Sequence, residues 1–596
     1  MRKGDEIMAE RKKQSLLAGA GVLAIATILV KLIGAVFKIP INNILGTEGY
    51  GYFTGAYAVY TPLYAISMAG LPVAVSKLVS QNMELGRIKD AKAIFKVAQK
   101  MFFLVGVVGM LILMAIAIPY STFNEAPMNY VSIFAVAPCV LFCCMMSSFR
   151  GYYEGLNNMT PTGVSQVIEA VVKLIFGLSA AYVFMEATLS HYEKNAVNGA
   201  MKLFGVEVNG EKEALATIYP YAAAVAILGV TLGSAFGLLY LYIRYKRKGF
   251  GFTREELVNS PEAKSNKDIM KSLLAISIPV AAASLVTNIS NLIDDITIRS
   301  RLVTALSGDG FTVVKDMYKD TLLAAKTLDD NISTYLYGMH GSVINIKNLI
   351  PSLTLVLGIS AIPVLSKAWT ANNKKDIKVC IESALRVAML VAMPAGIGIA
   401  VLSEPILNLL YGGGNEHFAP SAAFMMTVYG LAVPLFALAS PLTNMLQAVG
   451  KTKVPIVTMA IGAVIKVTLN FILIANPEIN IKGACISSSI CYIVMVTINI
   501  FQLTKAAGVK LNYVSIFVKP FIAAVFCGVG AYLGNFLLVD VLGIQSRLTT
   551  ILAVCVGGVF YVISILLVKG IAKDDLEMIP KGEKIAKVLA KFGILG

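Results

Sequence analysis

The sequence predicts an all-α integral membrane protein with about 14 transmembrane helices, arranged as two pseudo-symmetric six-helix lobes plus two C-terminal helices. Two observations predict this fold class. Hydrophobic residues make up 57% of the 596 residues and charged residues only 14%, and the mean hydropathy is +0.73. Similar stretches also recur at the same depth in both halves of the chain. The first observation excludes a soluble globule, and the second indicates an internal repeat.

The apolar runs are long enough to cross a bilayer as helices, because about 20 residues suffice. The first run, residues 15–40, follows the basic residues Arg11, Lys12 and Lys13. It is too long for the core of a signal peptide and is therefore predicted to be a retained span. The other predicted spans are residues 51–80, 94–118, 129–153, 162–187, 216–243, 272–299, 341–366, 383–403, 420–448, 454–475, 483–504, 513–538 and 547–568.

Charge outside the predicted spans indicates the orientation. Lys and Arg are concentrated in the N-terminus, the even-numbered connections and the C-terminus, and they are sparse in the odd-numbered connections. Because cytoplasmic loops carry the excess of basic residues, both termini are predicted to be cytoplasmic in a multi-pass protein of the cell membrane. The net charge of +16 therefore indicates topology, and no nucleic-acid partner is expected.

A basic connection divides the predicted repeat. Residues 244–271 separate the first six spans from the next six, and GLPVAVSK at 70–77 resembles GISAIPVLSK at 358–367. Six spans return the chain to the same side, so the halves should be parallel repeats about an axis along the membrane normal. The predicted domains are an N-lobe at 1–250, a cytoplasmic linker at 251–271, a C-lobe at 272–510, spans 13 and 14 at 511–570 and a tail at 571–596.

Three polar segments complete the predicted topology. The tail places Lys residues among apolar ones at helical spacing, which predicts an amphipathic helix on the anionic lipids of the inner leaflet; a solvated tail is the alternative. Residues 188–215 and 300–340 are predicted to be long polar loops on the outer face.

Two stretches at matching places in the repeat carry a charge inside the membrane. Residues 149–176 and 446–471 each contain a turn, a Pro that opens a helix and then a Lys inside an apolar run, Lys173 and Lys466 respectively. Each Lys lies about 16 to 18 Å into its helix, near the middle of the bilayer. A charge at that depth costs about 2.5 to 3.5 kcal/mol and normally faces a bundle interior or an aqueous cavity.

Polar side chains repeat along the fifth span. Gln166, Glu169 and Lys173 follow three- and four-residue spacing and form one stripe, with Glu169 placed to pair with Lys173. The stripe is either part of a substrate site or a structural ion pair that joins two helices. In the eleventh span, Lys466 has Asn470 one turn on and no acidic residue within a turn, which favours a role as a ligand.

The first span contributes two more cations to the candidate substrate site. Lys31 and Lys38 are seven residues apart, so they lie on nearly the same helix face. Lys31 is the deeper of the two. Lys38 is near the outer end, where the alternative is an ammonium group that reaches the interface.

The seventh span carries candidate ion-coupling residues near its outer end. Asn288, Asn291, Asp295 and Arg299 follow three- and four-residue spacing beside Asp294. Two interpretations stay open. One is a structural ion pair between Asp295 and Arg299, and the other is a carboxylate at Asp294 or Asp295 that couples transport to a cation.

The sequence contains no signature of catalysis or of a metal site. It has no nucleophile elbow, Walker loop or zinc-ligand spacing, and the eight Cys lie almost wholly in apolar runs without a CxxC pair. We expect a protein that is not an enzyme and has no cofactor, with coupling to the membrane potential, H⁺ or Na⁺ as an open alternative. The remaining feature is a cationic cavity between two lobes, which suits a substrate with phosphate or carboxylate charge.

These residues also carry a resemblance to a known family. The runs FRGYYEGLNNMTPTGVSQVIEAVVKLIF, KLIGAVFKIPINNILG and NLIDD are similar to the polysaccharide-flippase branch of the multidrug/oligosaccharidyl-lipid/polysaccharide (MOP) exporter superfamily. Within it, the chain resembles the stage V sporulation protein B and MurJ-like lipid II flippase group of Gram-positive bacteria, over nearly its whole length. The resemblance implies two lobes in a V around a central cavity and a lipid-tail groove at the last two helices. It also implies that Lys31 and Lys38 line the cavity.

The resemblance implies transport of a lipid-linked sugar. The expected substrate is an undecaprenyl-diphosphate-linked sugar lipid, lipid II of peptidoglycan synthesis, moved by alternating access while Lys31, Lys173 and Lys466 engage its diphosphate. Other expected partners are anionic membrane lipids and cell-wall synthesis enzymes. One alternative is a multidrug or cation antiporter of the same superfamily, which the basic lining disfavours. The other is a non-transporting membrane scaffold for wall synthesis, which would leave the buried Lys residues unexplained.

Overall fold

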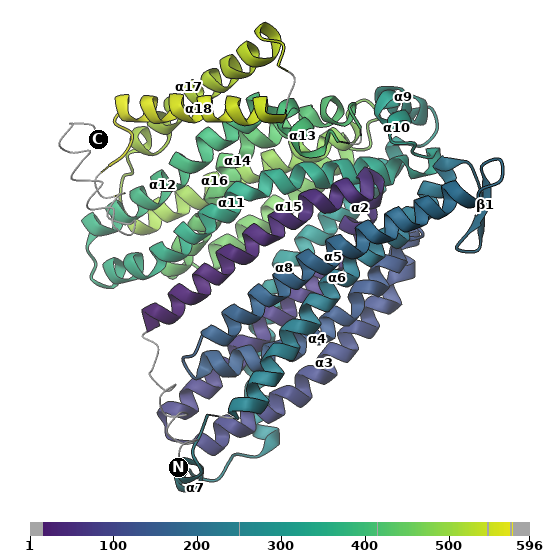
Figure 1. Ribbon diagram of the computed structural model, residues 1–596. Coiled ribbons are helices and arrows are strands. Elements are labelled where there is room, and N and C mark those ends of the chain that lie inside the picture. Colours follow the sequence, from purple (N-terminus) through teal and green to yellow (C-terminus); the bar gives the residue numbers. More distant parts are fainter. Residues whose placement is uncertain (1–15, 250, 414, 545–546, 573–574, 576–596) are drawn as a thin grey trace. The chain divides into compact units, whose positions relative to one another are not determined.

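The computed structural model describes residues 16–249, 251–413, 415–544, 547–572 and 575 (Figure 1). These residues are helical except for one β-hairpin and the connecting segments. They form two compact units. The first unit takes its residues from Met1–Ser300 and Lys326–Gly338, and the second from Arg301–Ala325 and Met339–Gly596. The chain therefore leaves the first unit after residue 300, returns to it for residues 326–338 and leaves it again.

The two units are not divided at the predicted 251–271 linker, because most of α8 (Asn266–Ala305) falls in the first unit. The predicted linker contains a short helix, α7 (Arg254–Asn259), which begins with a capping box between Thr253 and Glu256. It also contacts the start of another helix, since the backbone N–H of Lys264 donates to Asp90 Oδ1 at 2.6 Å. The division into two six-span lobes stays a prediction.

One helix of the first unit covers two predicted spans. α2 (Leu16–Glu84) is 69 residues long and includes residues 15–40 and 51–80 of the sequence prediction almost entirely. It bends at Gly46, whose φ of 67° lies in the left-handed region that glycine adopts without strain. The connection between the first two predicted spans is thus a kink. The other long helices of this unit are α3 (Ile88–Phe123), α4 (Asn129–Gly155), α5 (Thr160–Asn195) and α6 (Glu211–Lys248).

Small residues let α4 pack closely on α2 within the first unit. A side-chain carbon added at Gly151 would lie 2.5 Å from the carbonyl oxygen of Pro72, and one at Gly155 would lie 2.8 Å from that of Ser76. Close backbone approach through glycine is a common way for membrane helices to associate. The packing fixes the end of α4 that carries Arg150.

Eleven helices among the described residues are long and apolar enough to cross a membrane. In that number α2 counts once although it covers two predicted spans, and neither α8 nor α11 (Ile332–Thr370) is included. The chain is therefore a multi-pass, all-α membrane protein. The count of 14 spans stays a prediction.

The segment predicted to be a polar loop at 188–215 is mostly regular structure. α5 continues to Asn195, and two antiparallel strands, β1 (Ala200–Leu203) and β2 (Val206–Asn209), precede α6. Phe204 and Gly205 both have positive φ, 47° and 89°, as the two-residue turn of a hairpin requires. The loop prediction was wrong here because it rested on polarity, and the two strands are mostly exposed, so that their polar sequence does not distinguish them from a loop.

The segment predicted to be a polar loop at 300–340 is also structured. It contains the end of α8, then α9 (Gly310–Met317), α10 (Lys319–Ala324) and the short 3₁₀ helix η1 (Asp329–Asn331). α9 and α10 each bury apolar side chains, including Val314 and Leu322. Amphipathic helices of one or two turns carry too few apolar residues to stand out in a polar stretch of sequence.

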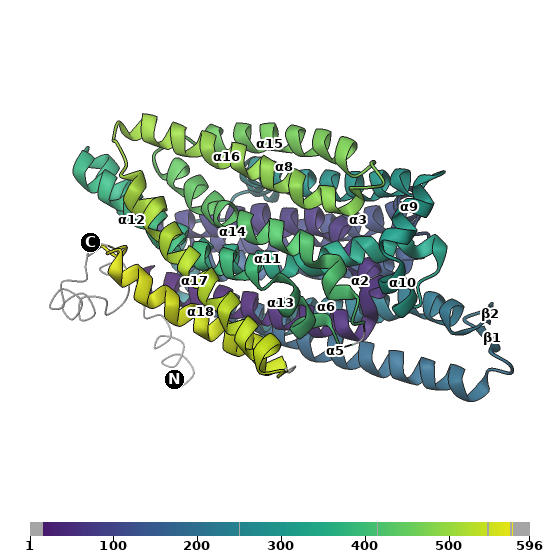
Figure 2. The same cartoon turned by 90° about the horizontal axis from the view of Figure 1, so that it is seen from above.

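The second unit contains the remaining helices. α17 and α18 lie side by side and form its last helical pair (Figures 1 and 2). α12 packs against α17. The long and short helices of the second unit after α10 are α11, α12 (Lys374–Val401), α13 (Ser403–Tyr411), α14 (Phe418–Ala448), α15 (Lys453–Leu473), η2 (Asn480–Lys482), α16 (Gly483–Ala507), η3 (Val514–Val518), α17 (Lys519–Phe536), η4 (Leu537–Val541) and α18 (Arg547–Leu567).

A buried ion pair fastens the segment after α18 to α12. Arg386 donates through Nε to Asp575 Oδ2 at 2.7 Å and through Nη2 to Oδ1 at 2.8 Å. Ser383 also donates to this carboxylate, and Arg386 Nη1 donates to Ser515 Oγ at 2.8 Å. A bidentate geometry with additional hydrogen bonds is the arrangement in which a buried pair offsets its desolvation. The predicted tail helix at 571–596 lies almost wholly outside the described residues.

Candidate functional site

The carboxylate of the fifth-span stripe is bound by an arginine from the preceding helix. Arg150 on α4 is 1% exposed, and its Nη2 donates to Glu169 Oε2 on α5 at 3.1 Å. Ser234 on α6 donates to the other oxygen of Glu169 at 3.3 Å. Arg150 Nε donates to Ser165 Oγ at 2.9 Å. The carboxylate that was predicted to pair with Lys173 is therefore paired with Arg150, and it also interacts electrostatically with Lys173.

Sequence reasoning missed Arg150 as a partner. It lies at the end of the predicted fourth span, where a basic residue is expected to reach the interface, and 19 residues separate it from Glu169. The signal was the position of Arg150 inside an apolar run, next to the turn that brings α4 back along α5. Three- and four-residue spacing does not predict an ion pair between two helices, because such spacing relates residues on one helix only.

Lys173 lies against an aromatic ring. Its Nζ is 5.1 Å from the ring centroid of Phe37 on α2, within the range of a cation–π interaction. Lys38, the next residue after Phe37, interacts electrostatically with Lys173. Both Lys side chains are half-buried, as is Lys31 one or two turns earlier on α2. The first unit thus brings Lys38 and Lys173 together beside Phe37.

The third residue of the stripe offers an unsatisfied acceptor. Gln166 Oε1 is buried and has no hydrogen-bond partner among the described residues. A buried amide oxygen without a donor costs about 1 to 3 kcal/mol. Such an atom fits a site that receives a donor from a bound molecule or water.

The candidate coupling residues of the seventh span lie on α8, in the first unit. Asp295 Oδ2 accepts a hydrogen bond from Tyr120 at 2.8 Å. Arg299 is 3% exposed, donates to the carbonyl oxygen of Gly51 at 2.9 Å and stacks over the ring of Tyr337 with its Cζ 3.6 Å from the centroid. These contacts give both residues structural roles. A direct Asp295–Arg299 pair stays a prediction, and Asp294 is half-buried beside them.

The amide residues predicted to join this group cannot be placed at the level of side chains. Asn288 and Asn291 are on α8, but their side chains lie outside the described part of the structure. Their role as coupling residues stays a prediction. In the part of the chain that the structure describes, no group of three His, Cys, Asp or Glu side chains is placed to hold a metal ion.

In the second unit, Lys466 is a half-buried residue of α15. Asn470, one turn on, is fully buried and accepts a hydrogen bond from Ser487 on α16. Asn470 therefore joins two helices through Ser487. Lys173 and Lys466 belong to different units. That both contact the same diphosphate therefore stays a prediction.

Comparisons with known proteins agree on one superfamily. A family model described as "Polysaccharide biosynthesis protein" matches residues 16–199, and one described as "Lipid II flippase MurJ" matches residues 351–539. The lipid II flippase MurJ of Bacillus subtilis (strain 168) is 25% identical over 563 residues, covering 92% of this chain and 94% of that protein. Stage V sporulation protein B of the same organism is 22% identical over 573 residues, covering 95% and 98%. The chain is similar to both of these proteins over nearly its whole length, and separate parts of its two halves match the two family models.

The fold of this chain is similar to that of a solved structure. A structure of a lipid II flippase MurJ in an inward closed conformation has a TM-score of 0.61 and 14% sequence identity, and the match covers 91% of this chain and 97% of that one. At this identity the likeness concerns the fold alone. It confirms the predicted all-α membrane fold.

Sequence reasoning missed a further cation inside a predicted span. Lys347 on α11 is half-buried, with its Nζ 4.1 Å from the ring centroid of Phe436 and 4.9 Å from that of Tyr429. It lies inside the predicted span 341–366, so its sequence signal equals that of Lys173 or Lys466. It was overlooked because no matching Lys occurs at the same depth in the other half of the repeat.

Proposed function

We propose that the protein is a flippase for undecaprenyl-diphosphate-linked sugar lipids, and that its substrate is lipid II. The observation that carries the proposal is the charge balance of the first unit. Arg150 pairs with Glu169 at 3.1 Å, so one carboxylate is shared between the two cations Arg150 and Lys173, and Lys38 adds further positive charge near Lys173 beside Phe37. A diphosphate is the part of such a lipid that requires cations within the membrane.

The proposed mechanism is transport by alternating access, without a covalent step. Lys31, Lys173 and Lys466 contact the diphosphate from the two repeats, and the polyprenyl tail stays in lipid beside α17 and α18. The termini are cytoplasmic. The protein works with anionic lipids at its tail and with cell-wall synthesis enzymes that supply or consume the lipid. The membrane potential, H⁺ or Na⁺ supplies the driving force, with Asp294 or Asp295 as the coupling carboxylate.

The choice of Lys over Arg favours release of the substrate as well as binding. A Lys ammonium group is a compact, strongly hydrated point charge and does not form the planar two-bond contact that Arg makes with phosphate oxygens. The diphosphate can therefore exchange between ammonium groups and water as the cavity opens. Transport requires this property, because a site that binds too tightly holds its cargo.

The direct test is lipid II translocation in vesicles containing the purified protein. Lys173→Gln should reduce the rate about tenfold or more, which corresponds to about 1.4 kcal/mol of lost interaction. Lys246→Gln is a matched control, because Lys246 also lies over an aromatic ring, that of Tyr242 at 5.5 Å, but at the end of α6. Wild-type translocation by Lys173→Gln would contradict the proposal. Competition by undecaprenyl-diphosphate lipids with other sugars tests the assignment of lipid II.

A further inference from the structure

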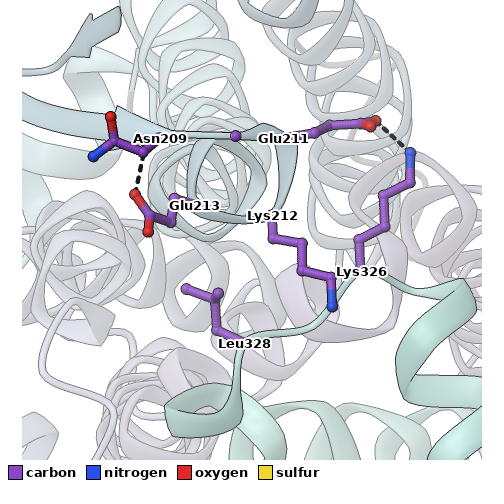
Figure 3. Close-up of a pocket in the computed structure, with 7 residues that line it drawn as sticks. Asn209, Glu211, Lys212, Glu213, Lys326 and Leu328 are labelled. Carbon is purple, nitrogen blue, oxygen red and sulfur yellow. Dashed lines mark hydrogen bonds and ion pairs between the residues drawn. The ribbon is translucent and has the colours of Figure 1, made fainter. Parts of the chain in front are cut away.

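Residues 326–338, which we term the strap, are held against the first unit although the chain on both sides of them belongs to the second unit. At one end of the strap, Lys326 Nζ lies 2.5 Å from Glu211 Oε1 at the start of α6 (Figure 3). At the other end, a side-chain carbon added at Gly338 would lie 1.9 Å from the carbonyl oxygen of Thr47. The strap is thus in close backbone contact with α2 just after its kink.

The centre of the strap covers a buried carboxylate. Glu48 on α2 is 3% exposed, and its Oε1 accepts a hydrogen bond from Asn331 Nδ2 at 2.7 Å. The hydroxyl of Thr327 also lies beside this carboxylate. That hydroxyl is buried, with Thr327 6% exposed, and it has no partner in hydrogen-bond geometry among the described residues. Both neighbours from the strap are therefore neutral.

The other elements around Glu48 do not supply a paired cation. Tyr52 from α2 and Tyr219 from α6 bring phenol groups into electrostatic contact with it. Arg299 from α8 acts on Tyr52 but is committed to the Gly51 carbonyl and the ring of Tyr337. No ion-pair partner of Glu48 is found in the described part of the chain.

The remaining charges near the strap are exposed. Glu211 and Lys326 pair with each other at its first residue, with side chains 53% and 44% exposed. Asp329 and Asp330, which precede Asn331, are exposed as well. Their interactions are screened by water, so they contribute little to the energy of a carboxylate buried beneath the strap.

A carboxylate in this position is stable as a neutral acid. An ionised carboxylate that is removed from water without a paired cation costs several kcal/mol, and protonation removes that cost. The neutral acid can donate its proton to Thr327 Oγ1 while it still accepts from Asn331. The ionised form can accept from both, but its negative charge is solvated only when water reaches it. Water can reach it only when the strap moves away from the first unit.

We propose that Glu48 binds and releases a proton, and that its charge state controls how firmly the strap is held on the first unit. The proton exchanges with bulk water, and no other group changes its bonds. When Glu48 is neutral, the strap is docked. When Glu48 is ionised, water enters beneath the strap and loosens it, which frees the chain that connects the two units. This switch does not depend on which lipid is transported.

The test is hydrogen–deuterium exchange of peptides from the strap in the full-length protein, in lipid nanodiscs, between pH 5 and 9. Glu48→Gln keeps the shape and cannot ionise. The ratio of wild-type exchange to Glu48→Gln exchange at each pH removes the intrinsic pH dependence of amide exchange. Since the neutral form favours docking, the ratio should be close to one at low pH and should rise about tenfold or more at high pH.

Two further variants make the result specific. Thr327→Val removes a hydroxyl that can hydrogen-bond to either form of Glu48, and the ionised form, which has no paired cation, loses more by its removal. Strap exchange at high pH should therefore exceed that of wild type by a larger factor than it does at low pH. Glu211→Gln removes the exposed ion pair to Lys326 and should raise strap exchange by the same factor at every pH. A wild-type to Glu48→Gln ratio that stays constant from pH 5 to 9 would overturn the proposal. If the ratio of wild-type to Glu211→Gln exchange rose with pH as the ratio of wild-type to Glu48→Gln exchange does, the titrating group would be Glu211, and the proposal would be overturned as well.

Discussion

Arg150 Nη2 lies 3.1 Å from Glu169 Oε2, and this contact determines what Lys173 can do one turn later on α5. A Lys paired with Glu169 on its own helix would form a neutral structural unit. The carboxylate is engaged by α4 and by Ser234 of α6, and Lys173 lies over Phe37. Glu169 thus acts on two cations, Arg150 through an ion pair and Lys173 through a longer-range interaction, so that one negative charge is shared between two positive ones.

Removing one member of this pair should destabilise the protein. Arg150→Met leaves Glu169 as a largely buried carboxylate without its cation, at a cost of about 3 to 5 kcal/mol. Thermal unfolding in detergent, followed by circular dichroism, should show a clear decrease in melting temperature. The double variant Arg150→Met with Glu169→Gln removes both charges and should recover most of the loss. Lys326→Gln, which removes an exposed pair with Glu211, is the control and should cost about 1 kcal/mol or less.

Lys466 is predicted to be a substrate ligand in the second unit. Lys466→Gln removes a charge from the middle of a predicted span, so insertion becomes easier by up to about 2.5 to 3.5 kcal/mol and expression should equal or exceed that of wild type. Lipid II translocation should nevertheless fall about tenfold. Lys453→Gln, at the exposed start of the same helix, is the matched control and should transport normally. Normal transport by both variants would remove Lys466 from the site.

The distribution of basic residues predicts which side each connection faces. Single Cys residues at Ala263 and Ala371 should react with a membrane-impermeant thiol reagent only from the cytoplasmic side, and those at Glu207 and Ser307 only from outside. All four positions are exposed, which makes accessibility independent of packing. The experiment requires a background without the eight native Cys. External labelling at Ala263 would contradict the predicted orientation and the lobe model that depends on it.

Asp294 and Asp295 should differ in their effect on coupling. Asp295 accepts a hydrogen bond from Tyr120, so Asp295→Asn and Tyr120→Phe should each lower the melting temperature while the response of transport to a proton or sodium gradient is kept. Asp294→Asn should weaken that response. Translocation is measured in vesicles with and without an imposed gradient. An unchanged gradient response in both Asp variants would show that neither carboxylate couples transport to a cation.

The sequence predicted the fold class well because the bilayer imposes a strong constraint on length and hydropathy. Every long helix from α3 onward overlaps a predicted span, since about 20 apolar residues have no other stable arrangement in lipid. The two segments predicted to be outer loops, residues 188–215 and 300–340, were predicted poorly. The β1–β2 hairpin and the helices α9 and α10 depend on packing between short elements, which leaves only a weak pattern in the sequence.

The candidate site was predicted in part for a similar physical reason. Because a charge in the membrane is costly, Lys38 and Lys173 could be predicted as functional residues from the sequence. The structure brings them together beside Phe37. Partners on other helices were not predictable, because Arg150 and Glu169 are 19 residues apart and Glu48 and Asn331 are 283 residues apart. Contacts of that kind follow from helix packing in three dimensions.

The Arg386–Asp575 pair makes the assembly of the second unit depend on the order of synthesis. Arg386 lies in α12, and its carboxylate partner is 189 residues further along the chain. A protein is made from its N-terminus, so α12 is synthesised before α13 to α18. Until Asp575 has been synthesised, the guanidinium group of Arg386 must be solvated by groups other than its final partner. The final packing of α12 is therefore completed only when the segment after α18 arrives. The buried Arg386 thus obtains its carboxylate partner only after every helix of the second unit has been synthesised.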